Sequence, residues 1–223
     1  MKLYYHPASI TSRPLMLYVA ENDLDVELKV VDLMTGAHHE EPFINMNPNR
    51  LVPVLDDAGF ILTESSAILK YLADKYDLPT YPKELKARAR VNERMDWFNT
   101  QFYREYGYHL VYPQIFPHHR RADEAAQEGT ISWGKERAAV AMQLLDDHII
   151  GNYKYVCGDD LTIADFMGAS MVTAGDHIRV DFSKFPNVKR WLETMRLLPT
   201  WNKTNEVHYG LADSLKDKQF HVI

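Results

Sequence analysis

The sequence predicts a small α/β domain followed by an all-helical domain. Short strand-like and helix-like stretches alternate over residues 2–76, whereas every strong pattern after the proline-bearing stretch 78–82 is helical. With 223 residues, 46% of them hydrophobic, the chain can build one large core or two modest ones. We expect domains at 1–77 and 87–223, joined by a linker at 78–86.

The chain begins with a β-α-β pattern. A strand at 3–5 is followed by a helical pattern and then by a second strand at 26–30 with period-two alternation. Pro14 suits the first turn of the helix, where the backbone N–H groups have no intrahelical partner. Thr11 or Ser12 can cap this helix.

The α/β half ends with a hairpin and a helix. Two short apolar stretches, 53–55 and 60–62, flank the turn-forming run Asp56-Asp57-Ala58-Gly59, which predicts an antiparallel hairpin. The apolar positions that then recur at helical spacing are Ile68, Leu69, Leu72 and Tyr76. A small α/β unit with this order of elements resembles thioredoxin.

Apolar stripes at helical spacing predict the core faces of helices in the second half. The three stripes are Val91, Met95, Phe98 and Phe102; Val140, Ala141, Leu144 and Leu145; and Val188, Trp191, Leu192 and Met195. Thr162 and Asp165 have capping-box spacing and should start a buried helix.

Composition excludes several classes of partner. Asp and Glu outnumber Lys and Arg 31 to 25, and a net charge of −6 repels phosphate backbones, so we expect no nucleic acid. The N-terminus lacks a signal-peptide core and no run reaches a membrane span, so we expect no membrane partner and a cytoplasmic location. The single cysteine, Cys157, agrees with that location. The adjacent pair His118-His119 has no metal-ligand spacing, so we expect no metal.

Four motifs in order carry a family resemblance. Residues 6–13 (HPASITSR) resemble the Ser-x-x-Ser/Cys-Arg element of delta- and theta-class cytosolic glutathione S-transferases, including their bacterial relatives. Residues 47–55 (NPNRLVPVL) are similar to the family's Asn-Pro…Val-Pro-x-Leu segment, and 62–69 (LTESSAIL) to its Glu-Ser-x-Ala-Ile signature. Residues 161–165 (LTIAD) match its C-terminal capping motif.

The resemblance implies the glutathione transferase fold and an enzyme of the EC 2.5.1.18 type, with glutathione as co-substrate. Ser9 is then the catalytic residue, because its hydroxyl can donate to the glutathione sulfur while the following helix adds positive potential. A loop serine that only makes a local turn is the alternative for Ser9. Tyr5 is the rival thiol activator, since other transferase classes use a tyrosine at the end of the first strand.

Ser65 and Glu64 match the residues that hold the γ-glutamyl end of glutathione in the family. Ser65 starts a helix, so its N–H and hydroxyl can bind the carboxylate, and Glu64 can hold the ammonium group. Without the resemblance, Ser65 could equally be a cap and Glu64 a favourable first-turn acid.

The remaining glutathione contacts come from the segments before the hairpin. The resemblance implies a cis bond between Val52 and Pro53, which turns the Val52 N–H and C=O toward the cysteinyl backbone of glutathione. His38 and Arg50 are the candidates for the glycine carboxylate, and His39 has a weaker case. An ordinary trans proline and solvated surface charges are the alternatives.

The second substrate, a small hydrophobic electrophile, should bind between the domains. We expect Tyr106, Tyr112 and Phe116 to line its pocket, although aromatic residues at helical spacing more often belong to a core. The same thiolate could conjugate the electrophile in detoxification, displace halide as in dehalogenases, or cleave an ether as in β-etherases. A non-catalytic transferase-fold binding module is the alternative from another class. The resemblance also implies a homodimer.

Overall fold

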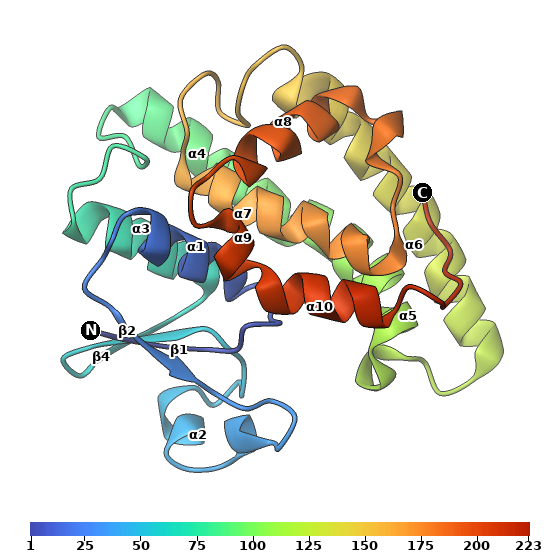
Figure 1. Cartoon of the computed structure of the whole chain (residues 1–223), viewed down its shortest axis with the longest axis horizontal. Coiled ribbons are helices and arrows are strands. Elements are labelled where there is room, and N and C mark those ends of the chain that lie inside the picture. Colours follow the sequence, from blue (N-terminus) through green and yellow to red (C-terminus); the bar gives the residue numbers. More distant parts are fainter.

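A computed structural model describes residues 1–223 (Figure 1). The first third of the chain forms a four-stranded sheet with helices around it, as the sequence predicts. Its elements are β1 (Lys2–Tyr5), α1 (Arg13–Glu21), β2 (Glu27–Val30), η1 (Ala37–His39), α2 (Phe43–Met46), β3 (Val54–Asp57), β4 (Phe60–Thr63) and α3 (Ser65–Lys75).

The strands lie in the order β2-β1-β3-β4. β1 pairs parallel with β2 and antiparallel with β3, and β3 pairs antiparallel with β4. The predicted hairpin is therefore confirmed, and its two turn residues, Ala58 (φ 53°) and Gly59 (φ 94°), have the positive φ values that a tight hairpin turn requires. β2 is an edge strand with all four residues exposed, so its alternating sequence does not mark a buried face here.

α1 and α3 cover one face of the sheet and the short α2 lies on the other (Figure 1). Leu3 and Leu55 point toward α1 and α3 in the main hydrophobic core. On the opposite face, a small cluster of Val31, Phe43, Val52 and Val54 is buried under α2. This smaller cluster fixes the segment that leads into the predicted cis proline.

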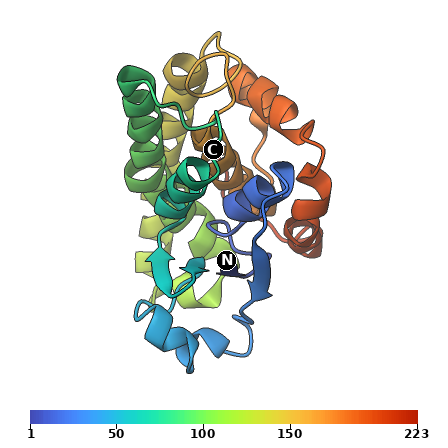
Figure 2. The same cartoon turned by 90° about the vertical axis from the view of Figure 1, so that its left-hand side faces the viewer.

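The rest of the chain is helical, as predicted, and packs above the α/β domain in Figure 2. Its elements are α4 (Leu85–Trp97), η2 (Phe98–Phe102), η3 (Arg104–Val111), α5 (Tyr112–Ile115), η4 (Pro117–His119), α6 (Glu124–Leu144), η5 (Leu145–Ile150), α7 (Ile163–Val172), η6 (Thr173–Ile178), η7 (Phe182–Lys184), α8 (Pro186–Arg196), α9 (Trp201–Thr204) and α10 (Glu206–Ser214). None of these helices combines the length and the apolar character needed to cross a bilayer.

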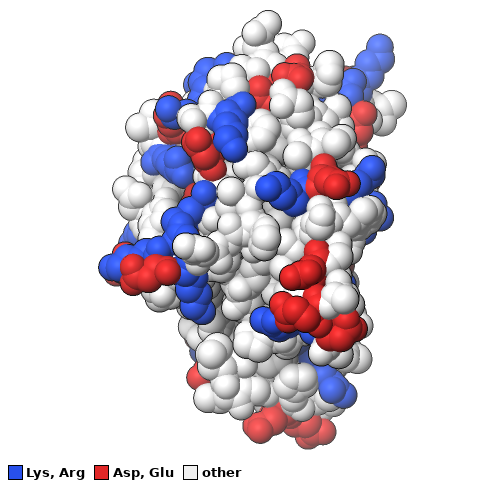
Figure 3. Space-filling model, turned by 90° about the vertical axis from the view of Figure 1, so that its right-hand side faces the viewer, with Lys and Arg blue, Asp and Glu red and all other residues white.

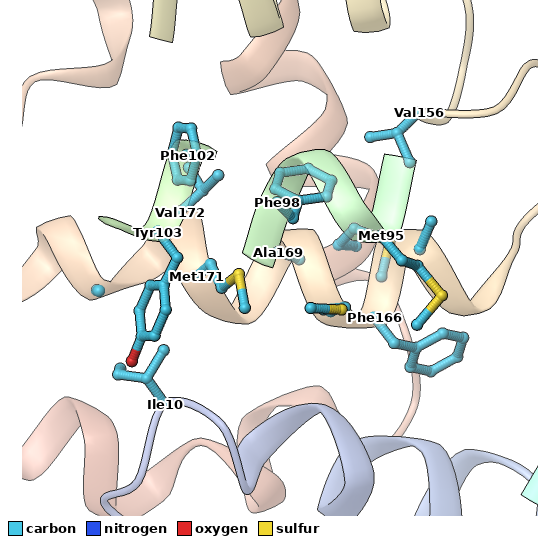
Figure 4. Close-up of a cluster of buried hydrophobic side chains, with 14 of the residues drawn as sticks. Ile10, Met95, Phe98, Phe102, Tyr103, Val156, Phe166, Ala169, Met171 and Val172 are labelled. Carbon is cyan, nitrogen blue, oxygen red and sulfur yellow. The ribbon is translucent and has the colours of Figure 1, made fainter. Parts of the chain in front are cut away.

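α7 is the central helix, and all ten of its residues are buried. It begins with the predicted capping box: the Thr162 hydroxyl and N–H both donate to Asp165, at 3.0 and 2.9 Å. Figure 4 shows Phe98 and Phe166 packed around α7, with α1 running alongside. One continuous core of 45 buried residues thus includes side chains from both halves of the chain.

One predicted stripe is only half right: Leu145 is buried in the core and Ala141 packs against it, but the other two residues are exposed. Val140 and Leu144 lie on the outer surface of α6, 64% and 39% exposed. The buried face of this helix consists instead of Gln127, Ile131, Gly134, Ala138 and Met142. α6 approaches η3 so closely that a Cβ on Gly134 would lie 2.4 Å from the His109 carbonyl oxygen, which explains the small residues on this face.

Candidate functional site

Ser9 lies in the loop between β1 and α1, three residues before Ser12, which occupies the N-cap position of that helix. Its carbonyl accepts from the N–H groups of Ser12 and Arg13 at 3.1 and 3.0 Å, and its hydroxyl oxygen accepts from the Ser12 N–H at 3.3 Å. Ser12 is thus the N-cap residue, as one of the two expected alternatives, but it makes no side-chain cap bond: its hydroxyl is buried without a partner, and the Thr11 hydroxyl bonds elsewhere. A group bound beside Ser9 therefore feels the positive end of α1.

Ser9 is also linked to the segment before β3. Its hydroxyl oxygen lies 3.1 Å from that of Thr11, and the Thr11 hydroxyl donates to the Val52 carbonyl at 3.1 Å. The Val52–Pro53 peptide bond is cis, as expected. The Val52 N–H makes no hydrogen bond within the chain, so it is free to donate to a ligand.

Tyr5, the rival activator, is the last residue of β1. Its carbonyl accepts from the Val31 N–H at 2.7 Å, and its half-buried side chain packs against the main core. Its hydroxyl forms no hydrogen bond within the chain.

Glu64 and Ser65 begin α3 in a conformation that leaves the helix end open. Glu64 has a φ of 66°, which is costly for a residue with a side chain, and no side chain caps the helix. Ser65 is buried at 6% exposure and makes no side-chain hydrogen bond, whereas the hydroxyl of its neighbour Ser66 accepts from Asn99 at 3.1 Å. The helix end thus presents unpaired N–H groups and a hydroxyl, the donors that a carboxylate needs.

The helical domain reaches Glu64 through Tyr108. Burial raises the pKa of the Tyr108 phenol, and the Glu64 carboxylate raises it further. The Tyr108 ring lies 5.2 Å from that of Tyr103 and 5.3 Å from that of Tyr112. In Figure 4, Tyr103 points toward Ile10 of the Ser9 loop, and both residues belong to the main core. The two predicted halves of the site therefore lie against each other.

His38 and Arg50, the candidates for the glycine carboxylate, are close enough for their charges to interact. Burial lowers the pKa of His38, and the charges of His39, Arg50 and His118 lower it further. The buried Nδ1 of His38 has no partner, and Arg50 is exposed and forms no ion pair within the chain. The exposed Arg50 guanidinium therefore has unused donors for an anion, and His39 is exposed as well.

The aromatic residues divide into core and surface. Tyr106 has no exposed surface and its hydroxyl donates to the Val172 carbonyl at 3.1 Å, so the prediction that it lines a substrate pocket is corrected: it is a core residue. The Tyr112 hydroxyl bonds that of Tyr103 in the interior. Phe116 is half-buried, its ring 5.2 Å from Tyr112.

Three residues at the candidate site were not predicted as site residues from the sequence: Tyr108, His119 and Thr11. Tyr108 is 43% exposed and lies within the aromatic run, but nothing in the run separates exposed from buried members. The His119 ring packs 5.0 Å from the Tyr112 ring and 5.5 Å from the Tyr108 ring, whereas the sequence drew attention to His118-His119 only as a candidate metal site. Thr11 was considered only as a cap.

The structure contains no group of three or more His, Cys, Asp or Glu side chains placed to hold a metal ion. Cys157 lies away from the Ser9 loop. Its side chain is partly buried, and burial raises the pKa of its thiol to about 12.

Both halves of the chain are similar to known proteins. The models of the glutathione S-transferase N-terminal and C-terminal domains match residues 1–74 and 116–199. Human glutathione S-transferase theta-1 is 32% identical over 224 residues, which cover 99% of this chain and 91% of that protein. A delta-class glutathione transferase of Nilaparvata lugens has a TM-score of 0.82 at 31% identity, over 96% of this chain and 98% of its own. Human glutathione transferase theta-2, solved in complex with glutathione and an unknown ligand, has a TM-score of 0.83 at 26% identity, over 99% and 92% of the two chains.

Proposed function

The chain belongs to the glutathione S-transferase family, and on that premise we propose that Ser9 stabilises the thiolate of glutathione for attack on an apolar electrophile. Its relatives are delta- and theta-class transferases, and the activity is of the EC 2.5.1.18 type. The sulfur–carbon bond forms as the leaving group departs or as the electrophile takes up the electron pair.

One observation carries the role of Ser9. Its hydroxyl lies at the N-terminus of α1 and is joined through Thr11 to Val52, whose own N–H is unpaired. The cysteinyl residue of glutathione needs an acceptor for its N–H, a donor for its C=O and a donor for its sulfur. The Val52 carbonyl, the Val52 N–H and the Ser9 hydroxyl supply these three groups in one place, beside the cis Pro53.

The two charged ends of glutathione have separate partners in this proposal. The open end of α3 receives the γ-glutamyl carboxylate through Ser65, and the exposed Glu64 carboxylate receives the ammonium group. His38 and Arg50 bind the glycine carboxylate, since Arg50 has free donors and lies close enough to His38 to lower its pKa.

The electrophile binds against the exposed aromatic surface of the helical domain. Tyr108 and Phe116 provide this surface, with Tyr112 behind them. Held between these rings and the Ser9 loop, the two substrates react as if in a single molecule.

In this proposal residues 1–77 bind glutathione, residues 87–223 provide most of the electrophile pocket, and residues 78–86 are the linker. We further propose a homodimer, in which apolar side chains such as Leu51 and Phe60, 61% and 51% exposed, become covered. Detoxification in the cytoplasm fits this activity. Acidic and basic side chains are interspersed on the face of Figure 3, which supports partners other than nucleic acid or membrane.

The decisive experiment compares Ser9→Ala with Tyr5→Phe. A hydrogen bond to a charged group contributes about 1.5–3 kcal/mol, so Ser9→Ala should raise the pKa of the bound thiol by about one to two units and lower turnover about 10- to 100-fold. Tyr5→Phe removes the rival hydroxyl and should leave the thiol pKa unchanged. A raised pKa in Tyr5→Phe alone would transfer the role to Tyr5. Glutathione binding without turnover on a panel of electrophiles would instead indicate a binding module.

A further inference from the structure

A chain of hydrogen bonds runs from the Ser9 hydroxyl through the Thr11 hydroxyl to the Val52 carbonyl. The position of each hydrogen follows from counting the donors and acceptors. Each hydroxyl has one hydrogen. The Val52 carbonyl can only accept, so the hydrogen of Thr11 points to it. The 3.1 Å contact between the two hydroxyl oxygens must then use the hydrogen of Ser9, which points to Thr11.

This direction is unsuited to catalysis. In the free protein the only hydrogen that Ser9 could donate to a sulfur is already given to Thr11. The Val52 carbonyl, which is the proposed acceptor for the cysteinyl N–H of glutathione, has Thr11 as its only partner and keeps a second lone pair for that N–H. The Ser12 N–H meanwhile donates into the Ser9 oxygen at 3.3 Å, so this oxygen stays in place whichever way its hydrogen points.

We propose that Thr11 is a positioning residue that couples occupation of the Val52 carbonyl to the orientation of the Ser9 hydroxyl. The proposal rests on the proposed function. When the cysteinyl N–H donates to the Val52 carbonyl, this buried acceptor keeps a partner without Thr11, so the Thr11 hydrogen can turn to the Ser9 oxygen. The Ser9 hydrogen then turns to the sulfur. No proton changes its oxygen; both hydroxyl groups only rotate.

In the glutathione-bound state Ser9 accepts two hydrogen bonds, from the Ser12 N–H and from Thr11, while it donates one to the sulfur. Hydrogen bonds in such a chain polarise one another and strengthen by about 10–30% each. Thr11 therefore makes Ser9 a better donor to the thiolate. A threonine that only tied two loops together would not affect the acidity of a bound thiol.

The test uses Thr11→Val, which keeps the branched shape but has no hydroxyl, and Thr11→Ser, which keeps the hydroxyl. The ultraviolet absorbance of the thiolate gives the pKa of bound glutathione in each variant. We expect Thr11→Val to raise this pKa by about half a unit, roughly a threefold loss of thiolate below the pKa, and Thr11→Ser to retain the original value. Thr11→Ala serves in the same way should Thr11→Val not fold.

Binding of S-methylglutathione separates positioning from a loop tie. This analogue makes the Val52 contacts but has no ionisable thiol, so Thr11→Val should bind it at least as well as the unmutated protein does. The proposal is overturned if the thiol pKa falls or stays constant in Thr11→Val, or if it rises equally in Thr11→Ser. Weakened binding of S-methylglutathione to Thr11→Val would overturn it as well. If Ser9→Ala leaves the thiol pKa unchanged, the proposed function fails first, and the two failures are distinguishable.

Discussion

Arg13 and His208 meet in the interior, with Arg13 Nη1 3.0 Å from His208 Nδ1 and neither side chain exposed. The guanidinium can only donate, so Nδ1 of His208 accepts and its Nε2 hydrogen faces Asp176 at 3.2 Å. Arg13 also donates to Asn205 at 2.7 Å and to Thr173 at 2.8 Å. The first turn of α1, just beyond the Ser9 loop, is thereby fixed to the C-terminal helices.

Arg13→Met should lower the free energy of unfolding by about 3–5 kcal/mol. Burial already lowers the pKa of the Arg13 guanidinium to about 10, and its removal leaves buried acceptors on Asn205 and His208 unpaired. Urea unfolding measures the change. Arg120→Met is the matched control, since Arg120 pairs with Glu124 on the surface and should contribute less than about 1 kcal/mol. Equal effects of the two substitutions would contradict this interpretation.

His177 should make the fold less stable in acid. Both ring nitrogens are buried without partners, and burial together with the neighbouring His208 and Arg13 lowers the pKa of His177 to about 3. Between about pH 6.5 and 3 the unfolded chain binds the additional proton, so stability rises with pH in this window and is lost on acidification. The expected contribution is about 1.4 kcal/mol per pH unit.

The Asp165 carboxyl has the opposite effect on how stability depends on pH. Burial raises its pKa to about 6, so the folded state holds a proton that the unfolded chain releases. The measurement is therefore the difference in unfolding free energy between the unmutated protein and His177→Phe, followed from pH 6 to pH 4. This difference should change by about 1.4 kcal/mol per unit in favour of the variant on acidification. A constant difference would show that His177 does not titrate as inferred.

Local signals predicted much of the fold. The α3 stripe and the capping box at Thr162 work because their patterns depend on neighbours in the sequence, and tertiary packing agreed with them. Half of the α6 stripe failed, because the helix buries Gly134 and Ala138, with Gly134 at a close approach to η3, and leaves the larger Val140 outside. Hydrophobicity alone cannot identify a face that is buried because its residues are small.

The predicted glutathione contacts depend on motifs, whereas the supporting contacts depend on the fold. Arg13 and His208 are 195 residues apart in the sequence, so no local spacing pattern could predict their contact. Tyr106 and Tyr108 are two residues apart, but their exposed fractions are 0% and 43% because they lie on different sides of η3. The bond from Thr11 to Val52 likewise spans 41 residues and needed the folded loops to bring it together.

Ser65 and Ser66 provide a matched pair for the γ-glutamyl site. Both are in the first turn of α3, but the Ser66 hydroxyl is paired with Asn99 at 3.1 Å, whereas that of Ser65 has no partner within the chain. If the γ-glutamyl carboxylate binds at this helix end, only Ser65 has a hydroxyl available for it.

Ser65→Ala should therefore weaken glutathione binding about 10- to 100-fold, because a hydrogen bond to a carboxylate contributes about 1.5–3 kcal/mol. The thiol pKa should not change, since the substitution is at the glutamyl end and leaves Ser9 intact, so KM should rise more than kcat falls. Ser66→Ala should leave the affinity for glutathione unchanged and cost only about 1 kcal/mol of stability, through the lost bond from Asn99. Titration calorimetry with glutathione measures both variants. An equal loss of affinity in the two would mean that the substitutions act by disturbing the helix end, and the role of Ser65 as a carboxylate ligand would then be wrong.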